Sequence, residues 1–190
     1  MDTRWIVGVV LAIIVVGGGF ALSRGGLPSS TATSTAQERP LKTYYDEKYG
    51  IAFNFPDNYS VKESDSVEGV KHHTIAVGEA SALSKPPQNS EAPPMITIDI
   101  YNNPTNQSTE KWVKGNSFSN YKLSGDASLA STTVAGIPAL AYPWDGLYRS
   151  TSIVFPNKGK MYMMSVGFNS TDDQLYKDFA KVVASVQLDP

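Results

Sequence analysis

The two histidines of the sequence, His72 and His73, are the residues best suited to acid–base or metal chemistry, and they are adjacent. Neighbouring residues on a strand point to opposite faces, so these imidazoles cannot chelate one ion together. One of them could hold a metal with Glu63, Asp65 or Glu68. The alternative is that both lie on a solvated strand edge beside a turn. We favour the solvated edge, and therefore assign no metal ligand and no cofactor.

The motifs of several common catalytic classes are missing. The sequence contains no cysteine, which excludes disulfides, thiolate catalysis, zinc–cysteine sites, iron–sulfur clusters and a lipid-modified cysteine. The sequence also lacks the Gly-x-Ser-x-Gly motif, which places a nucleophilic serine on a sharp turn. Asp99 lies within an alternating apolar strand and could act as a base, but a partly solvated, hydrogen-bonded carboxylate is the simpler interpretation. The sequence thus predicts a protein that is not an enzyme. The alternative is an exported hydrolase with an unrecognised site.

A cluster of aromatic residues around Asp145-Gly146 is the best candidate for binding a protein partner. Asp-Gly favours a two-residue type I′ turn, which would place Trp144 opposite Leu147 and form an apolar patch with a cation at its edge. Trp, Tyr and Arg dominate interface energetics. The alternative is that the first two aromatic residues fold back onto the sheet. The predicted partner-binding residues are Tyr142, Trp144, Leu147, Tyr148 and Arg149.

Residues 5–22 form an uncharged apolar run. A helix of that length spans about 27 Å, close to the hydrocarbon thickness of a bilayer. Arg4 precedes the run and a polar chain follows it, so we expect a single-pass signal anchor in the cell membrane, with the C-terminal domain outside the cytoplasm. The alternative is a cleaved leader, because small residues flank possible cleavage sites at 19–21 and 21–23. The protein would then be secreted and soluble.

Residues 23–41 are rich in Ser, Thr, Ala and Gly and contain almost no large apolar side chain. Such a segment cannot bury enough surface to offset its ordering entropy, which predicts a disordered linker. The chain therefore divides into an N-terminal transmembrane anchor at 1–22, a linker at 23–41 and one extracytoplasmic domain at 42–190.

The charge of the chain bears on its partners. The formal net charge is −2, and no cluster of basic residues is present. Non-specific binding to nucleic acid needs several clustered cations, so we expect no nucleic-acid partner. The expected partners are the lipid bilayer, through residues 5–22, and a protein.

Alternating apolar residues predict a sheet-rich domain. Both faces of 160–168 are apolar, which predicts a strand covered on both sides. The stripe of Leu175, Phe179 and Val182 predicts a helix packed on a sheet, and we expect Phe53 and Phe179 in the core. A surface loop is predicted at 80–94, and a short helix with a Ser or Thr N-cap at 110–113. The predicted strands are 43–46, 51–55, 59–63, 72–77, 95–101, 129–134, 137–142, 147–155, 160–168 and 186–188.

Three motifs together resemble the PsbP-like domains. They are Tyr49-Gly50-Ile51-x-Phe53-x-Phe55-Pro56, then Val134-x-Gly136-x-Pro138-Ala139, and a closing Phe179–Ala184 helix followed by Ser185-Val186-x-Leu188. The resemblance covers about residues 42–188 and implies an α+β fold, with an antiparallel sheet sandwiched by helices. It implies a module that binds partners or ions rather than an enzyme. No residue set for calcium, manganese or Ran binding can be carried over. We therefore predict a membrane-anchored extracytoplasmic binding or assembly module without catalytic activity.

Overall fold

The computed structural model describes residues 39–66, 69–84 and 93–189 of the chain. The predicted anchor at 5–22, the predicted linker up to residue 38 and the middle of the predicted 80–94 loop lie outside the described residues. Within the described ranges, no helix combines the length and the apolar character that a membrane crossing requires.

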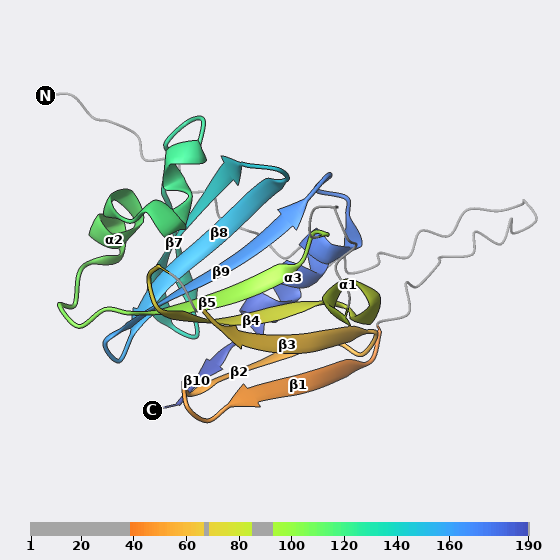
Figure 1. The fold of residues 1–190 in the computed structure, drawn as a ribbon. Helices are drawn as coiled ribbons and strands as arrows, with labels where there is room; N and C mark the ends of the chain where they lie inside the picture. The colour runs from red at the N-terminus through yellow and green to blue at the C-terminus, as the bar shows by residue number, and fades with distance from the viewer. Residues whose placement is uncertain (1–38, 67–68, 85–92, 190) are drawn as a thin grey trace, which may run out of the picture. The chain divides into compact units, whose positions relative to one another are not determined.

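Seven antiparallel strands form one large sheet, in the order β3-β4-β5-β9-β8-β7-β6 (Figure 1). Strand β9 is buried along almost its whole length, which confirms that it is covered on both faces. The central strands carry the alternation seen in the sequence, because every second side chain points into the main core. The strands are β3 (Tyr59–Asp65), β4 (His72–Glu79), β5 (Ile96–Asn102), β6 (Ala130–Val134), β7 (Ile137–Asp145), β8 (Arg149–Asn157) and β9 (Lys160–Phe168).

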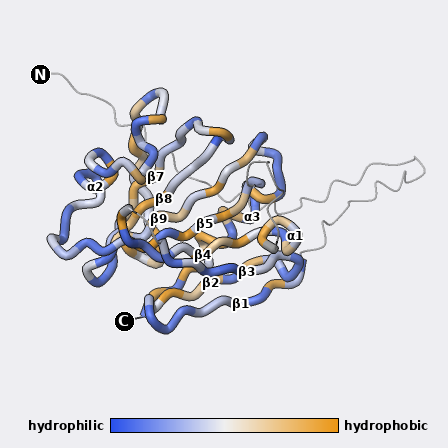
Figure 2. The backbone as a smooth tube through the Cα atoms, viewed as in Figure 1, coloured by the Kyte–Doolittle hydropathy of each residue, from blue (hydrophilic) through white to orange (hydrophobic). Residues whose placement is uncertain are grey.

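A second, three-stranded antiparallel sheet joins the two ends of the domain. It consists of β1 (Leu41–Asp46), β2 (Ile51–Pro56) and β10 (Gln187–Leu188), in the order β1-β2-β10. Phe53 of β2 is 1% exposed and lies in the main core, as predicted. Strand β1 is mostly exposed and largely hydrophilic (Figure 2). The sequence predicts one sheet, but the structure has two, because β2 turns its apolar face toward the large sheet instead of pairing with it.

Helices lie on both faces of the large sheet. Helix α3 (Gln174–Ala184) buries Phe179 and Val182 against β2 and β9, on the face that meets the small sheet. Helix α2 (Thr109–Gly115) buries Trp112 on the opposite face, beside β7 and β8. Two 3-10 turns, Ser117–Ser119 and Tyr121–Leu123, extend this cover. The predicted α+β fold with an antiparallel sheet is confirmed. The sheet is not sandwiched by helices alone, because α3 and the small sheet together cover one of its faces.

One helix begins where the sequence predicts it, and another forms where the sequence predicts only loop. Ser108 caps α2 as predicted, since its Oγ accepts the backbone N–H of Lys111 at 3.3 Å. A short helix, α1 (Ala80–Ser84), follows β4, where the sequence predicts only loop. Ala and Leu are strong helix formers, and Leu83 is buried beside β3 and β4, which explains this difference.

Candidate metal centre

His72 and His73 lie on β4 and point to opposite faces of the large sheet, as predicted. The ring of His72 stacks on Tyr101 on the α2 face, with 4.8 Å between centroids. His73 points toward the small sheet and is only 6% exposed. The expectation of a solvated edge is therefore wrong for His73, because the small sheet covers it.

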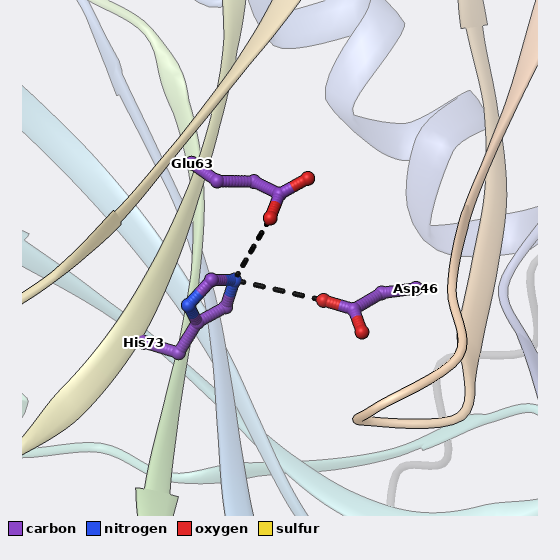
Figure 3. Close-up of side chains that lie close together, drawn as sticks. All are labelled: Asp46, Glu63 and His73. Carbon is purple, nitrogen blue, oxygen red and sulfur yellow. Dashed lines mark ion pairs between the residues drawn. The ribbon is translucent and has the colours of Figure 1, made fainter.

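His73 lies beside two carboxylates that come from different strands (Figure 3). Its Nε2 atom is 3.6 Å from Oδ2 of Asp46 and 3.7 Å from Oε2 of Glu63. Asp46 ends β1 in the small sheet, whereas Glu63 lies on β3, next to β4 in the large sheet. The three ligand atoms lie within 4.8 Å of one another, so a possible metal site spans the two sheets.

Each of the two carboxylates is held by a hydrogen bond to one of its oxygens. The backbone N–H of Tyr49 donates to Oδ1 of Asp46 at 3.1 Å. The hydroxyl of Tyr44 donates to Oε1 of Glu63 at 2.6 Å. The other oxygen of each carboxylate lies near His73, and Oδ2 of Asp46 is also 3.5 Å from the Tyr44 hydroxyl. Hydrogen bonds of this kind orient ligand atoms in metal sites and tune their affinity.

The imidazole of His73 is oriented by Asp65. Its Nδ1 lies 2.8 Å from Oδ1 of Asp65, and because a carboxylate only accepts, Nδ1 carries the proton. This hydrogen bond holds the pKa of the Asp65 carboxyl below its usual range. The ring also stacks on Tyr49, with 4.6 Å between centroids. The other ring nitrogen of His73, Nε2, faces the two carboxylates.

Nε2 of His73 is buried and makes no hydrogen bond within the described part of the chain. Leaving a buried polar atom unpaired costs free energy, and here the unpaired nitrogen also faces two carboxylates with no cation between them. A proton or a metal cation at Nε2 removes both problems. Zinc bonds of about 2.0–2.2 Å place tetrahedral ligand atoms about 3.4 Å apart. The distances to the two carboxylates are close to that value, and the half-exposed Glu63 can move to close the shell.

The sequence analysis predicts some residues of this site but not all of them. Glu63 and Asp65 are among the predicted partners of a histidine, and Glu68 lies outside the described residues. Asp46 is not predicted, because only the packing of the two sheets brings β1 next to β4. A signal for it exists: Tyr44 and Asp46 are two residues apart, on the less exposed face of a strand that is otherwise exposed.

The hairpin between β7 and β8 differs from the predicted one. Its loop contains three residues, 146–148, and Asp145 pairs with Arg149. Gly146 is not in the left-handed conformation that a type I′ turn requires. The reason is packing: the ring of Trp144 lies so close that a Cβ on Gly146 would be 2.8 Å from its Cζ3 atom.

The longer loop changes which residues share a face. Ser152 lies opposite Tyr142, whereas the predicted two-residue turn would place Arg149 there. Because the shift is an odd number of residues, Arg149 lies on the other face. Tyr142 is buried, and its hydroxyl donates to the backbone oxygen of Ser119 at 2.6 Å. Trp144 is half-buried, and its Nε1 donates to Oγ of Ser152 at 2.9 Å. Both aromatic residues therefore fold back onto the sheet.

The remaining predicted residues lie at the end of the hairpin. Leu147 is 59% exposed and Arg149 is exposed, whereas Tyr148 is half-buried and lies against Gly167. The five residues do not form the single patch that the sequence predicts. Partner binding at this tip stays a prediction.

Asp99, the candidate base, lies on the α2 face of the large sheet. Thr74 donates to its Oδ1 at 2.6 Å, and Nε2 of His72 is 3.8 Å away. Burial raises the pKa of the Asp99 carboxyl. These contacts agree with a hydrogen-bonded structural carboxylate.

No protein-family model matches the chain, and no curated protein matches its sequence. Among solved structures, the chain is similar to cyanobacterial PsbP (CyanoP) from Synechocystis sp. PCC 6803, with a TM-score of 0.54 and 12% identity over 82% of this chain and 96% of that one. A protein from Bacteroides thetaiotaomicron VPI-5482 gives a TM-score of 0.49 and 10% identity, over 78% of this chain and 48% of that one. LpqN, involved in cell envelope biogenesis of Mycobacterium tuberculosis, gives a TM-score of 0.44 and 14% identity, over 80% and 91%.

The described domain therefore has a PsbP-like fold, as the three sequence motifs predict. At 12% identity, the similarity to CyanoP defines the fold and leaves the ligand open. The candidate site of this chain is a buried histidine that faces two oriented carboxylates between two sheets.

Proposed function

We propose that this protein is a membrane-anchored extracytoplasmic binding module without catalytic activity, and that it binds a divalent transition-metal cation through Asp46, Glu63 and His73. The observation that carries the proposal is the buried Nε2 of His73, which faces two oriented carboxylates and has no hydrogen bond within the described ranges. Anchoring and location rest on the apolar run at 5–22.

The donor set favours zinc over calcium or magnesium. One imidazole nitrogen and two carboxylate oxygens suit a borderline transition metal, whereas calcium and magnesium prefer shells of oxygen alone. Asp65 behind His73 supplies the carboxylate–histidine–metal arrangement that is common around zinc. Three protein ligands leave one tetrahedral position for water or for a group from a partner.

Calorimetric titration of the full-length protein in detergent micelles with zinc chloride tests the proposal. We expect one zinc site that calcium and magnesium do not fill at the same concentration. His73→Gln should abolish one-site binding. His72→Gln is the matched control, since it makes the same change on the other face of the same strand, and it should bind zinc normally. Equal binding by the two variants would contradict the proposal.

Asp65→Asn tests the orientation of His73 without removing a ligand. The Asp65 side chain is 70% exposed, so the substitution should leave folding intact. Zinc affinity should fall about 10–100-fold, the usual effect of losing an outer-shell partner. Affinity should also fall as the pH decreases, because metal ligands must be deprotonated. If zinc affinity changed neither on Asp65→Asn nor on lowering the pH, zinc would have to bind at another site.

An exported hydrolase is the second candidate, because three protein ligands with one open position are also typical of catalytic zinc. The depression beside His73 has a volume of about 270 Å³, below the roughly 300–1,000 Å³ of most small-molecule sites, and neither Asp46 nor Glu63 lines it. We expect the zinc-loaded protein to hydrolyse an activated ester no faster than the His73→Gln variant. A zinc-dependent turnover that this variant lacks would favour the enzyme.

The membrane anchor has its own test. We expect the protein to fractionate with membranes, with an intact mass that includes residues 1–22. A mature chain that begins near Leu22 or Arg24 would favour the secreted, soluble alternative.

A further inference from the structure

The metal ligands are divided between the two sheets. Asp46 is the last residue of β1 in the small sheet, whereas Glu63 and His73 belong to β3 and β4 of the large sheet. Figure 3 shows the carboxylate of Asp46 approaching the imidazole from the side of the small sheet. An ion bound to all three residues therefore connects β1 directly to the large sheet.

Strand β1 has few apolar contacts of its own. It is an edge strand, and among the described strands it pairs with β2 alone. Leu41 and Tyr45 are each 55% exposed, and only Tyr44 and Asp46 turn away from solvent. Because apolar burial is the main stabilising contribution in folding, β1 is weakly held. Edge segments of this kind open locally at a lower free energy than the core.

Polar contacts hold the two ends of β1. Just before the strand, the guanidinium of Arg39 bonds the buried carboxylate of Asp178 on α3. Near its other end, Tyr44 donates to Glu63 across the two sheets. At that end the carboxylates of Asp46 and Glu63 approach the same nitrogen, and two like charges at such a distance repel. A cation between them turns this repulsion into attraction.

We infer that the bound metal ion is a clamp that fastens β1, the strand next to the predicted linker, to the large sheet. The inference rests on the proposed function. Local opening of β1 takes Asp46 out of the site, so an ion can stay only on the two remaining ligands. Metal binding therefore suppresses the opening by mass action. Occupancy of the site controls how firmly the domain holds its first strand.

Hydrogen–deuterium exchange of the full-length protein in detergent micelles tests the clamp. Exchange is measured without zinc chloride and with zinc chloride at 100 times the measured dissociation constant. The amides of β1 that bond β2 should exchange up to about 100-fold more slowly with zinc, because opening is suppressed by a factor of one plus the ratio of ligand to dissociation constant. The β6–β7 hairpin, whose opening leaves all three ligands in place, should not change.

Calorimetry on the same sample separates this inference from the proposed function. Zinc binding without slower exchange in β1 overturns the clamp and leaves the metal site. Absence of zinc binding overturns both. Equal slowing in β1 and in the β6–β7 hairpin means that zinc stabilises the whole domain, and it also overturns the clamp.

Two variants sharpen the test. Asp46→Asn keeps a side-chain oxygen for the N–H of Tyr49 but removes the charged ligand from β1. It should bind zinc more weakly, through Glu63 and His73, and lose the zinc-dependent protection of β1 even at saturation. Tyr44→Phe removes the hydrogen bond between the sheets but no ligand. It should speed exchange in β1 without zinc and keep the zinc effect. Protection of β1 in saturated Asp46→Asn would overturn the clamp.

Discussion

The indole ring of Trp144 lies over the backbone of Gly146, so that a Cβ on Gly146 would stand 2.8 Å from Cζ3 of the ring. The ring is held in place by the hydrogen bond from its Nε1 to Ser152. Glycine is therefore needed at position 146 because it has no side chain that would collide with the Trp144 ring. Its capacity for positive φ, the usual reason for glycine in a hairpin turn, is not used here.

Gly146→Ala should destabilise the domain by about 1–3 kcal/mol, because the new methyl group displaces a packed ring. Urea unfolding measures the loss. Gly125→Ala is the matched control, since a Cβ there meets no atom within 4 Å, and it should change stability by no more than about 0.5 kcal/mol. Equal stabilities for the two variants would contradict the packing of Trp144.

Trp144→Ala should lower the melting temperature, because Trp144 is partly buried and hydrogen-bonded to Ser152. We expect a loss of about 1–3 kcal/mol, in the range of most destabilising substitutions. Leu147→Ala, at the exposed tip of the same hairpin, is the control and should leave the melting temperature almost unchanged. An unchanged melting temperature for Trp144→Ala would restore the hypothesis of a partner-binding patch.

Arg39→Met should destabilise the domain by about 3 kcal/mol, the lower end of the range for a broken buried ion pair. The substitution leaves the carboxylate of Asp178, 1% exposed, with Tyr59 and Gln174 as its remaining hydrogen-bond donors among the described residues. Adding Asp178→Asn should recover part of the loss, because the unpaired charge is then gone. Arg149→Met, an exposed arginine, is the control for removing a cation. A larger loss in the double variant would show that the charge of Asp178 is not the cause.

Phe53→Ala should cost about 3–5 kcal/mol, because it opens a cavity in the main core. That is a large share of the roughly 5–15 kcal/mol by which domains are stable. Phe118→Ala, 37% exposed, is the matched control and should cost much less. Denaturant unfolding distinguishes the two. Similar losses of unfolding free energy in the two variants would mean that Phe53 of β2 does not lie in the core.

Alkaline pH should destabilise the domain through its buried tyrosines, which include Tyr101, whose pKa burial also raises. Burial raises the pKa of Tyr59, Tyr142 and Tyr162 to about 12 each, against about 10 in an unfolded chain. The unfolded chain therefore loses these protons first. Stability should be unaffected below about pH 10 and should fall as the pH rises from about 10 to about 12.

Urea midpoints across this interval, with the ultraviolet absorbance of phenolate as a second readout, measure the decline. Tyr162→Phe should make it shallower, since one of the buried phenol groups is removed. A Tyr162→Phe protein with an unchanged slope would show that Tyr162 titrates at its ordinary pKa in the folded domain.

Apart from the short helix α1, the order and type of the main strands and helices follow from local pattern. Phe53 between Ile51 and Phe55, and the spacing of Phe179 and Val182, predict a strand and a helix, because a period of two or of about 3.6 puts apolar side chains on one face. Ser108 predicts the start of α2 for a similarly local reason, since its side chain caps the backbone of its own first turn. The PsbP-like fold could therefore be predicted from motifs along the chain.

The register of the β7–β8 pair and the division of the strands into two sheets were beyond local pattern. At the β7–β8 hairpin, the sequence Asp145-Gly146 allows a two-residue turn, but the packing of Trp144 onto Ser152 selects a three-residue loop and so decides the face of every residue after it. The separate small sheet has the same origin. Whether β2 joins the large sheet or packs against it in a separate sheet depends on the free energy of the whole core. A short stretch of sequence does not determine that free energy.

The sequence by itself determined that His72 and His73 cannot share an ion, because strand geometry alone separates neighbouring side chains. It also supplied Glu63 and Asp65 as possible partners. Only the tertiary structure decided that His73 is buried and that the carboxylate of Asp46 lies beside it, since β1 and β4 meet through the packing of two sheets and not through any pairing between them. A metal site is a contact between distant segments, and such contacts are set by the packing of the whole domain.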